Sequence, residues 1–199
     1  TCGIKSAVAA KIAAAVKGSG IRYIGGHPMA GTERSGYENA FGDLFAGASM
    51  ILCPEYCDDE KALKTVSDFF LEIGFGRITL SSCAHHDEVI AFTSQLAHVV
   101  SSAYIHGRLS TAYSGFSAGS FADMTRVARL SADMWTELFF ENGANLSAAI
   151  GELIGNLQKY KTALDTGDRA AMHALLAEGN ARKIESEKLN LPKEGAKKC

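Results

Sequence analysis

The sequence lacks several features that would each indicate a class of protein. It has no run of about 18 apolar residues, which argues against a membrane-spanning helix. Residues 1–5 place no charged region before a continuous apolar core, which argues against a signal peptide. Basic and acidic side chains nearly balance, with a formal net charge of −2, so we expect no nucleic-acid-binding surface.

Cysteine is sparse and forms no recognisable metal-binding pattern. Among the five cysteines, Cys53 and Cys57 have a C-x3-C spacing, but no second pair or histidine tract completes a zinc set. We therefore expect no metal site, and free thiols in a reducing cytoplasm.

The first part of the chain alternates between strand and helix patterns. Short apolar runs predict strands at 21–25, 49–53 and 77–80, and helical spacing of apolar residues predicts helices at 6–17 and 61–73. Residues 27–40 are predicted to be a loop that leads into a short helix. This alternation predicts an α/β layer with parallel strand pairing.

From about residue 82 the pattern becomes helical. The predicted helices are 86–108, 123–129, 132–161 and 169–188, with a loop at 110–120, a cap at Asp168 and a disordered tail at 192–199. Several helices are apolar on more than one face, so each needs more than one partner. A monomeric bundle and a dimer both satisfy that need.

The heptapeptide 27–33 is the strongest candidate for a site. An apolar run followed by two glycines predicts a strand that delivers His27 to the edge of a sheet, where open α/β folds bind ligands. Pro28 cannot continue a central strand, so we expect the chain to leave the sheet there. Thr32 and Glu33 add a hydroxyl and a carboxylate nearby. The competing interpretation is a surface histidine or a satisfied core histidine.

Further motifs follow this heptapeptide in a fixed order. They are 34–36, 43–45, 51–54, His86-Asp87, 94–98 and 121–126, with Trp135 nine residues later. Together these motifs resemble the prephenate dehydrogenase family over about residues 1–160.

The resemblance implies a partial Rossmann-like fold followed by an all-α domain. Residues 1–81 would be the C-terminal part of an NAD(P)-binding domain. Residues 82–191 would be a helical substrate and dimerisation domain, similar to the C-terminal domain of 6-phosphogluconate dehydrogenase, and would form a homodimer. The sequence contains no G-x-G-x-x-G fingerprint, which in this family precedes the segment 2–6. We therefore expect a fragment that lacks the first half of the nucleotide domain, with NAD as cofactor and NADP left open.

The resemblance also implies an activity, the oxidative decarboxylation of prephenate to 4-hydroxyphenylpyruvate with reduction of NAD, in tyrosine biosynthesis. His27 would accept a hydrogen bond from the ring hydroxyl, which requires a neutral imidazole. Arg126 would bind a substrate carboxylate through two parallel hydrogen bonds. The alternative for Arg126 is a surface ion pair with Asp123.

The other expected site residues also follow from the resemblance. Ser94 and His98 share a helix face and would lie near the substrate side chain, and His98 favours prephenate over arogenate. The remaining substrate positions are Thr32, Glu33, Gly119, Asp123 and Trp135, and the cofactor positions are Gly3, Lys5, His27 and Pro28. Gly3 stands where many relatives have a serine. A satisfied interior histidine at 98 and a core anchor at Trp135 are the competing interpretations.

Three alternatives to this activity remain open from the sequence. The first is an arogenate dehydrogenase that forms tyrosine. The second is a catalytically silent helical dimerisation module, against which His27, Ser94, His98 and Arg126 argue. The third is another dehydrogenase with a Rossmann domain and a helical domain; such enzymes often use a lysine base, and residues 86–108 contain none.

Overall fold

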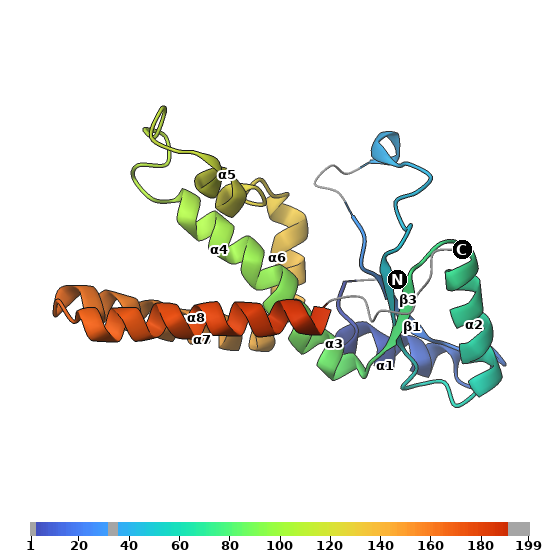
Figure 1. Ribbon diagram of the computed structural model, residues 1–199. Helices are drawn as coiled ribbons and strands as arrows, with labels where there is room; N and C mark the ends of the chain where they lie inside the picture. The colour runs from blue at the N-terminus through green and yellow to red at the C-terminus, as the bar shows by residue number, and fades with distance from the viewer. Residues whose placement is uncertain (1–2, 32–35, 191–199) are drawn as a thin grey trace. The chain divides into compact units, whose positions relative to one another are not determined.

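The computed structural model of the protein describes residues 3–31 and 36–190 (Figure 1). The chain forms two compact units, Thr1–Ala149 and Ile150–Cys199. The first unit contains a small sheet with its helices and then a group of further helices. The second unit is a helical hairpin. The predicted tail at 192–199 lies outside the described residues.

The sheet has three strands in the order β1-β2-β3, namely Gly25–Pro28, Ser49–Cys53 and Arg77–Leu80. β2 and β3 are parallel, as predicted, because helix α2 (Glu60–Glu72) provides the crossover between them. The expectation of parallel pairing is wrong for β1, which runs antiparallel to β2. The connection between β1 and β2 contains only a 3-10 turn, η1 (Tyr37–Asn39), among its described residues.

The first strand also lies later in the sequence than predicted. The expected strand was 21–25, but Ile21 is 64% exposed and the pairing with β2 begins at Gly25. His27 therefore lies within the strand and Pro28 is its last residue. Proline is tolerated there because β1 is an edge strand. The backbone N–H of Met29 then donates to the Ser49 carbonyl at 2.8 Å.

Alternating side chains of β2 contribute to two separate cores. Met50 and Leu52 are buried with Phe75, against α2 side chains that include Leu63, Val66 and Phe70. On the other face, Cys53 is buried with Ala9 of α1 (Ser6–Val16) and Cys83 of α3 (Cys83–Ile90). The sheet is therefore covered on both faces, with β2 contributing to both cores.

The predicted helix 86–108 is three consecutive segments. Helix α3 is followed by a π-helical turn, η2 (Ala91–Gln95), and by α4 (Leu96–Ile105). A π turn accommodates one extra residue, and such turns are frequent at functional sites. Apolar periodicity could not reveal it, because the spacing changes by only one residue.

The later helices also differ from the prediction in their limits. Helix α5 is Gly119–Thr125, so the predicted helix 123–129 begins and ends too late. The predicted helix 132–161 is divided at Asn142 into α6 (Ala132–Glu141) and α7 (Gly143–Asp165). Asn142 leaves helical geometry, with φ −117° and ψ 24°, and its side chain is buried. Helix α8 is Arg169–Asn190, and the predicted cap is confirmed, because Asp168 Oδ1 accepts from the Ala171 N–H at 2.9 Å.

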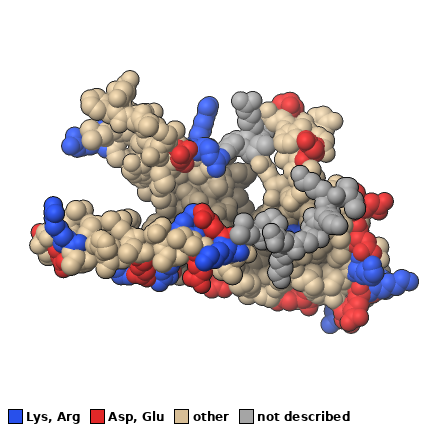
Figure 2. Space-filling model, in the orientation of Figure 1, with Lys and Arg blue, Asp and Glu red and all other residues tan. Residues whose placement is uncertain are grey.

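Acidic and basic side chains are interspersed on the face shown in Figure 2, without a large area of one sign. Among the described residues, no helix is both long and apolar enough to cross a membrane. Within the same part of the chain, no three histidine, cysteine, aspartate or glutamate side chains are grouped to hold a metal ion. The thiols of Cys53, Cys57 and Cys83 are free.

Candidate functional site

His27 lies at the edge of the sheet and contacts a second histidine on α3. In the antiparallel register, His27 is opposite Ile51 of β2. Its Nδ1 lies 2.8 Å from Nε2 of His86, and the two ring centroids are 5.0 Å apart. His86 comes from the first turns of α3, whose start is capped by the Ser82 hydroxyl, 3.1 Å from the His85 N–H. A strand and a helix that are 59 residues apart in sequence thus position one imidazole.

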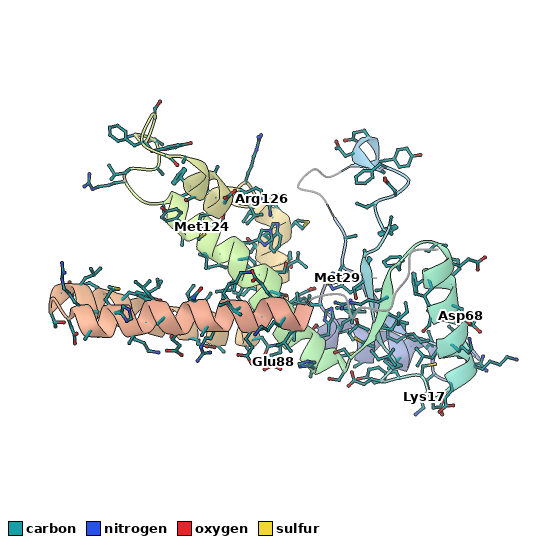
Figure 3. The ribbon with its side chains drawn as sticks, viewed as in Figure 1. Lys17, Met29, Asp68, Glu88, Met124 and Arg126 are labelled. Atoms are coloured by element: carbon teal, nitrogen blue, oxygen red, sulfur yellow. The ribbon has the colours of Figure 1, made fainter. Side chains whose placement is uncertain are left out.

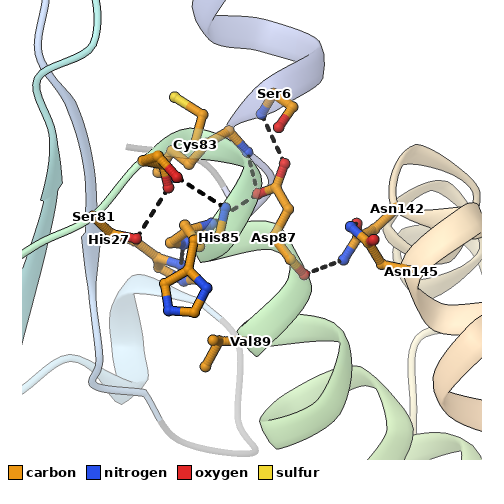
Figure 4. A network of polar contacts seen from close by, with 12 residues as sticks. Ser6, His27, Ser81, Cys83, His85, Asp87, Val89, Asn142 and Asn145 are labelled. Carbon is orange, nitrogen blue, oxygen red and sulfur yellow. Dashed lines mark hydrogen bonds and ion pairs between the residues drawn. The ribbon is translucent and has the colours of Figure 1, made fainter.

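Asp87 anchors the other end of this contact. Its Oδ1 lies 2.7 Å from Nδ1 of His86 and also accepts from the Lys5 backbone N–H at 2.8 Å. Its Oδ2 accepts from the Ser6 N–H, also at 2.8 Å (Figure 4). Burial by itself raises the pKa of Asp87, but the hydrogen bonds from His86, Lys5 and Ser6 outweigh it and lower the pKa to about 2. Asp87 is therefore a buried carboxylate near neutral pH.

The surroundings of His27 keep its imidazole neutral. Partial burial lowers the pKa of His27 from 6.5 to about 4, and the nearby Lys5 cation acts in the same direction. The side chain remains partly accessible, so a ligand can reach it. A neutral, accessible imidazole at a sheet edge can accept a hydrogen bond from a substrate hydroxyl.

A buried amide network connects α3 to the break between α6 and α7. Nδ2 of Asn142 donates to the Asp87 carbonyl and to Oε1 of Gln95, each at 2.8 Å. Nε2 of Gln95 donates to the Leu138 carbonyl at 2.8 Å. Asn145 donates to Oδ1 of Asn142 at 2.9 Å. These bonds satisfy polar groups that would otherwise be buried without partners, and they hold α3 and α6 together.

A second group of predicted residues lies on α4 and α6. The carbonyl of Ser94 can only accept, so Nδ1–H of His98 donates to it, at 2.8 Å. The His98 ring also lies against Trp135, with centroids 3.9 Å apart and planes tilted by 32°. Trp135 also packs against Phe139, with ring centroids 5.3 Å apart. The structure thus brings Ser94, His98 and Trp135 together, with the rings of His98 and Trp135 in contact.

The third group lies on α5. Gly119 and Asp123 belong to this helix, and Arg126 follows its last residue with an exposed side chain (Figure 3). The rings of Tyr104 and Phe121, 5.6 Å apart, pack α5 against α4. Arg126 therefore comes from the end of α5, whereas His27 lies on β1 and His98 on α4. Thr32 and Glu33, the other expected substrate residues, lie outside the described residues.

The expected cofactor residues surround the start of α1 and the end of β1. A side chain at Gly3 would be tightly placed, because its Cβ would lie 3.1 Å from Cδ2 of Leu138. The Lys5 side chain is buried next to Gly25. A Cβ placed on Gly25 would lie 3.4 Å from Cδ of Lys5. Pro28 is next to His27 at the end of β1.

Sequence reasoning missed the residues that hold His27. His86 and Asp87 were recognised only as a shared motif, although an adjacent His-Asp pair on a buried helix face was a usable signal. Gln95 and Asn142 gave no signal, because the two polar residues are 47 positions apart and look like ordinary helix surface residues.

The fold and the site together define a class of protein, in which an α/β nucleotide-binding part is joined to a helical domain. The family model "Prephenate dehydrogenase, nucleotide-binding domain" matches residues 1–80. The model "Prephenate dehydrogenase, dimerization domain" matches residues 82–178. The chain belongs to the prephenate dehydrogenase family.

Individual relatives agree with this assignment. The cyclohexadienyl dehydrogenase of Zymomonas mobilis subsp. mobilis is 38% identical over 149 residues, covering 71% of this chain and 50% of that protein. Synechocystis arogenate dehydrogenase is similar in structure, with a TM-score of 0.78 and 25% identity, over 94% of this chain and 68% of that chain. A prephenate dehydrogenase from A. aeolicus in complex with hydroxyphenyl propionate and NAD+ is also similar in structure, with a TM-score of 0.72 and 30% identity. The match covers 83% of this chain and 59% of that chain. The chain spans about half or less of the length of the curated relatives it matches.

Proposed function

We propose that the protein to which this chain belongs oxidises prephenate with NAD, forming 4-hydroxyphenylpyruvate, carbon dioxide and NADH. The observation that carries the proposal is the neutral His27, held through Nδ1 at the edge of the sheet in the nucleotide-binding part. The A. aeolicus relative in complex with NAD+ and hydroxyphenyl propionate supports the choice of cofactor and of a substrate with a six-membered ring.

His27 has one task in this reaction, which is to polarise the ring hydroxyl. As the C–H bond beside that hydroxyl breaks, the oxygen gains carbonyl character and its proton becomes acidic. A neutral imidazole accepts that proton, whereas an imidazolium cannot. The bond to the ring carboxylate then breaks, carbon dioxide leaves, the ring becomes aromatic, and the proton held by His27 returns to the ring oxygen. A bound nicotinamide would supply the acceptor for the hydride.

The residues at and beside His27 are compatible with such a cofactor. Hydride transfer needs a site where the substrate proton has an acceptor, and His27 provides one because its pKa is lowered to about 4. Lys5 and Pro28 lie close to His27, and together with Gly3 they are proposed to face the nicotinamide end. The 199 residues contain no G-x-G-x-x-G motif, so this chain is assigned only the reacting end of the cofactor.

The substrate carries two carboxylates, and separate groups are proposed for its two ends. Arg126 is proposed to bind one carboxylate with its planar guanidinium. Ser94 and His98 are proposed to face the side chain, because Nδ1–H of His98 is held by the Ser94 carbonyl and Nε2 is left to meet the ligand. Trp135 fixes the His98 ring by packing against it.

A second set of proposed residues completes the pocket. Gly119 and Asp123 are proposed to contribute from α5, and Thr32 and Glu33 from the connection between β1 and β2. A side chain at Gly119 would be in ordinary contact with Asp123 Oδ2, at 3.6 Å, so alanine fits this position sterically. Gly119→Ala therefore tests pocket volume rather than backbone geometry.

Arogenate is the second candidate substrate. The observation behind it is the structural similarity to Synechocystis arogenate dehydrogenase. Arogenate differs from prephenate by an amino group in place of the side-chain keto oxygen. His98 is the proposed selector between the two, because it lies where the side chain is expected.

A homodimer is proposed for the helical domain. The unit 150–199 exposes large apolar side chains, including Ile154 (60%), Leu157 (59%), Leu164 (70%) and Leu176 (59%). Exposed apolar area of this kind in a helical hairpin fits a partner surface, and the matching family model describes a dimerisation domain. Sedimentation analysis of the full chain tests this: a dimer that Leu157→Glu weakens supports the proposal, and a stable monomer contradicts it.

The activity assay uses the protein together with any upstream residues of its natural chain. Reduced nicotinamide is followed with prephenate and, separately, with arogenate. His27→Asn is expected to lower kcat by roughly 10²- to 10⁴-fold, whereas His106→Asn, at an exposed position, is the matched control. Turnover of arogenate alone would replace the substrate assignment. An unchanged kcat in His27→Asn would refute the role of His27.

A further inference from the structure

Three side chains form a continuous hydrogen-bonded chain from the interior to the candidate site. Asp87 contacts Nδ1 of His86 at 2.7 Å, and Nε2 of His86 contacts Nδ1 of His27 at 2.8 Å. The side chains of His86 and Asp87 are 0% and 3% exposed, so no solvent competes for these contacts. The function proposed above uses only the last member of this chain.

We infer that His86 and Asp87 are positioning residues that fix the hydrogen of His27 on Nδ1 and leave Nε2 as the acceptor for the substrate hydroxyl. This inference rests on the proposed function for its chemical meaning. The arrangement of hydrogens that it assigns can be measured without any turnover.

The argument follows from counting donors and acceptors. An ionised carboxylate only accepts, so Nδ1 of His86 must donate to Asp87. Under this inference His86 is neutral, so its single N–H is used on Asp87 and its Nε2 accepts. Nδ1 of His27 must therefore be the donor in the contact between the two rings. His27 is itself neutral, and its Nε2 is left without a hydrogen.

The anchor of this chain is rigid because several elements hold Asp87. Its two carboxylate oxygens accept from the N–H groups of Lys5 and Ser6 at the start of α1, which has no side-chain cap of its own. Its carbonyl accepts from Asn142. Rotation of the carboxylate would leave these N–H donors without their acceptor, so the carboxylate is held in one orientation.

The opposite arrangement would disable the proposed reaction. If His86 carried a hydrogen on Nε2, Nδ1 of His27 would have to accept it, and the His27 hydrogen would move to Nε2. The imidazole would then offer the substrate hydroxyl a donor where the reaction needs an acceptor. Fixing the tautomer thus decides whether His27 can act at all.

The test is nitrogen NMR of the full chain with ¹⁵N-labelled histidine, near neutral pH. The expected spectrum has Nδ1 protonated and Nε2 unprotonated in both His27 and His86. Assignments come from His27→Gln and His86→Leu. A hydrogen on Nε2 of His27, or hydrogens on both nitrogens of His86, overturns the inference. The wild-type measurement needs no variant to fold.

The neighbouring histidine provides a matched control. His85 is on the same helix and exposed, so His85→Leu should leave the His27 tautomer unchanged. His86→Leu removes the acceptor and should give a mixture of His27 tautomers, with kcat lowered on the order of 10- to 100-fold at nearly unchanged KM. His86→Gln, whose amide oxygen can accept from His27, should restore much of the loss. A single Nδ1–H tautomer that persists in His86→Leu overturns the inference.

The two proposals fail separately. If the enzyme turns over neither prephenate nor arogenate while NMR shows the expected tautomers, the proposed function is wrong and the positioning role stands. If turnover is rapid while His27 carries its hydrogen on Nε2, the positioning role is wrong and the function stands.

Discussion

Acid should destabilise this protein in a pH window that His27 defines. The pKa of His27 is lowered from 6.5 to about 4 in the folded chain. Between these two values the unfolded chain binds a proton that the folded chain does not. The free energy of unfolding therefore rises with pH across this window. The contribution is fully present above about pH 6.5 and is lost as the pH falls through about 4.

The size of this contribution can be bounded from the same shift. A difference of about 2.5 pKa units corresponds to about 3.4 kcal/mol as an upper limit. His27 is only partly buried, and solvent screens part of its interaction with Lys5. A discounted value of about 1–2 kcal/mol is the expected loss.

Urea unfolding at about pH 7, 5.5 and 4.5 measures this loss. His27→Gln is the informative variant, since glutamine does not titrate and its amide N–H can still donate to Nε2 of His86. The variant should lose about 1–2 kcal/mol less than the wild type on going from pH 7 to pH 4.5. His106→Gln, at an exposed position, should match the wild type. Asp87 does not confuse the result, because its pKa of about 2 places its effect at lower pH.

One outcome would refute the reasoning directly. If the wild type and His27→Gln lose the same free energy of unfolding between pH 7 and pH 4.5, His27 does not resist protonation in the folded state. The neutral imidazole on which the proposed chemistry depends would then lack support.

Three further predictions concern packing and binding. Asn142→Ala should lower the free energy of unfolding by about 2–4 kcal/mol, because it leaves the Gln95 oxygen and a backbone carbonyl buried without donors; Asn145→Ala is the milder control, and equal losses in urea unfolding would contradict the network. Leu52→Ala should lower the free energy of unfolding by about 2–5 kcal/mol in the same assay, since Leu52 is 1% exposed in the core of the sheet. A loss below about 1 kcal/mol would contradict tight packing at this position. Arg126→Lys should raise KM for the substrate about tenfold or more with a smaller change in kcat, and steady-state kinetics with unchanged KM would remove Arg126 from the site.

The sequence was most predictive where one face or both faces of an element are apolar. Strands β2 and β3 and helix α2 were placed nearly to the residue, because apolar runs are bounded by Pro54 and by glycines. Strand β1 was misplaced, since Gly25, Gly26 and Pro28 have low strand propensity. It is a strand because β2 offers its edge, which is a tertiary effect.

The site was predictable only in part for a similar reason. His27 was found from its local setting and from the family resemblance. Its partner His86 is 59 residues away, and no local pattern joins them. The division at Asn142 was also not predicted, because the sequence does not show whether an asparagine is exposed or, as here, buried and hydrogen-bonded to three other groups. Long-range polar pairing determines these features.

The antiparallel pairing of β1 with β2 has a consequence for how such a protein can diversify. Pro28 is paired with Met50, so the connection between the two strands starts and ends at adjacent positions. Doubling the length of a connection whose ends meet costs only about 0.6 kcal/mol in closure entropy. Insertions or new side chains can therefore accumulate in that connection while His27 keeps its register opposite Ile51. Changes in this connection therefore leave the position of His27 in the sheet unaltered.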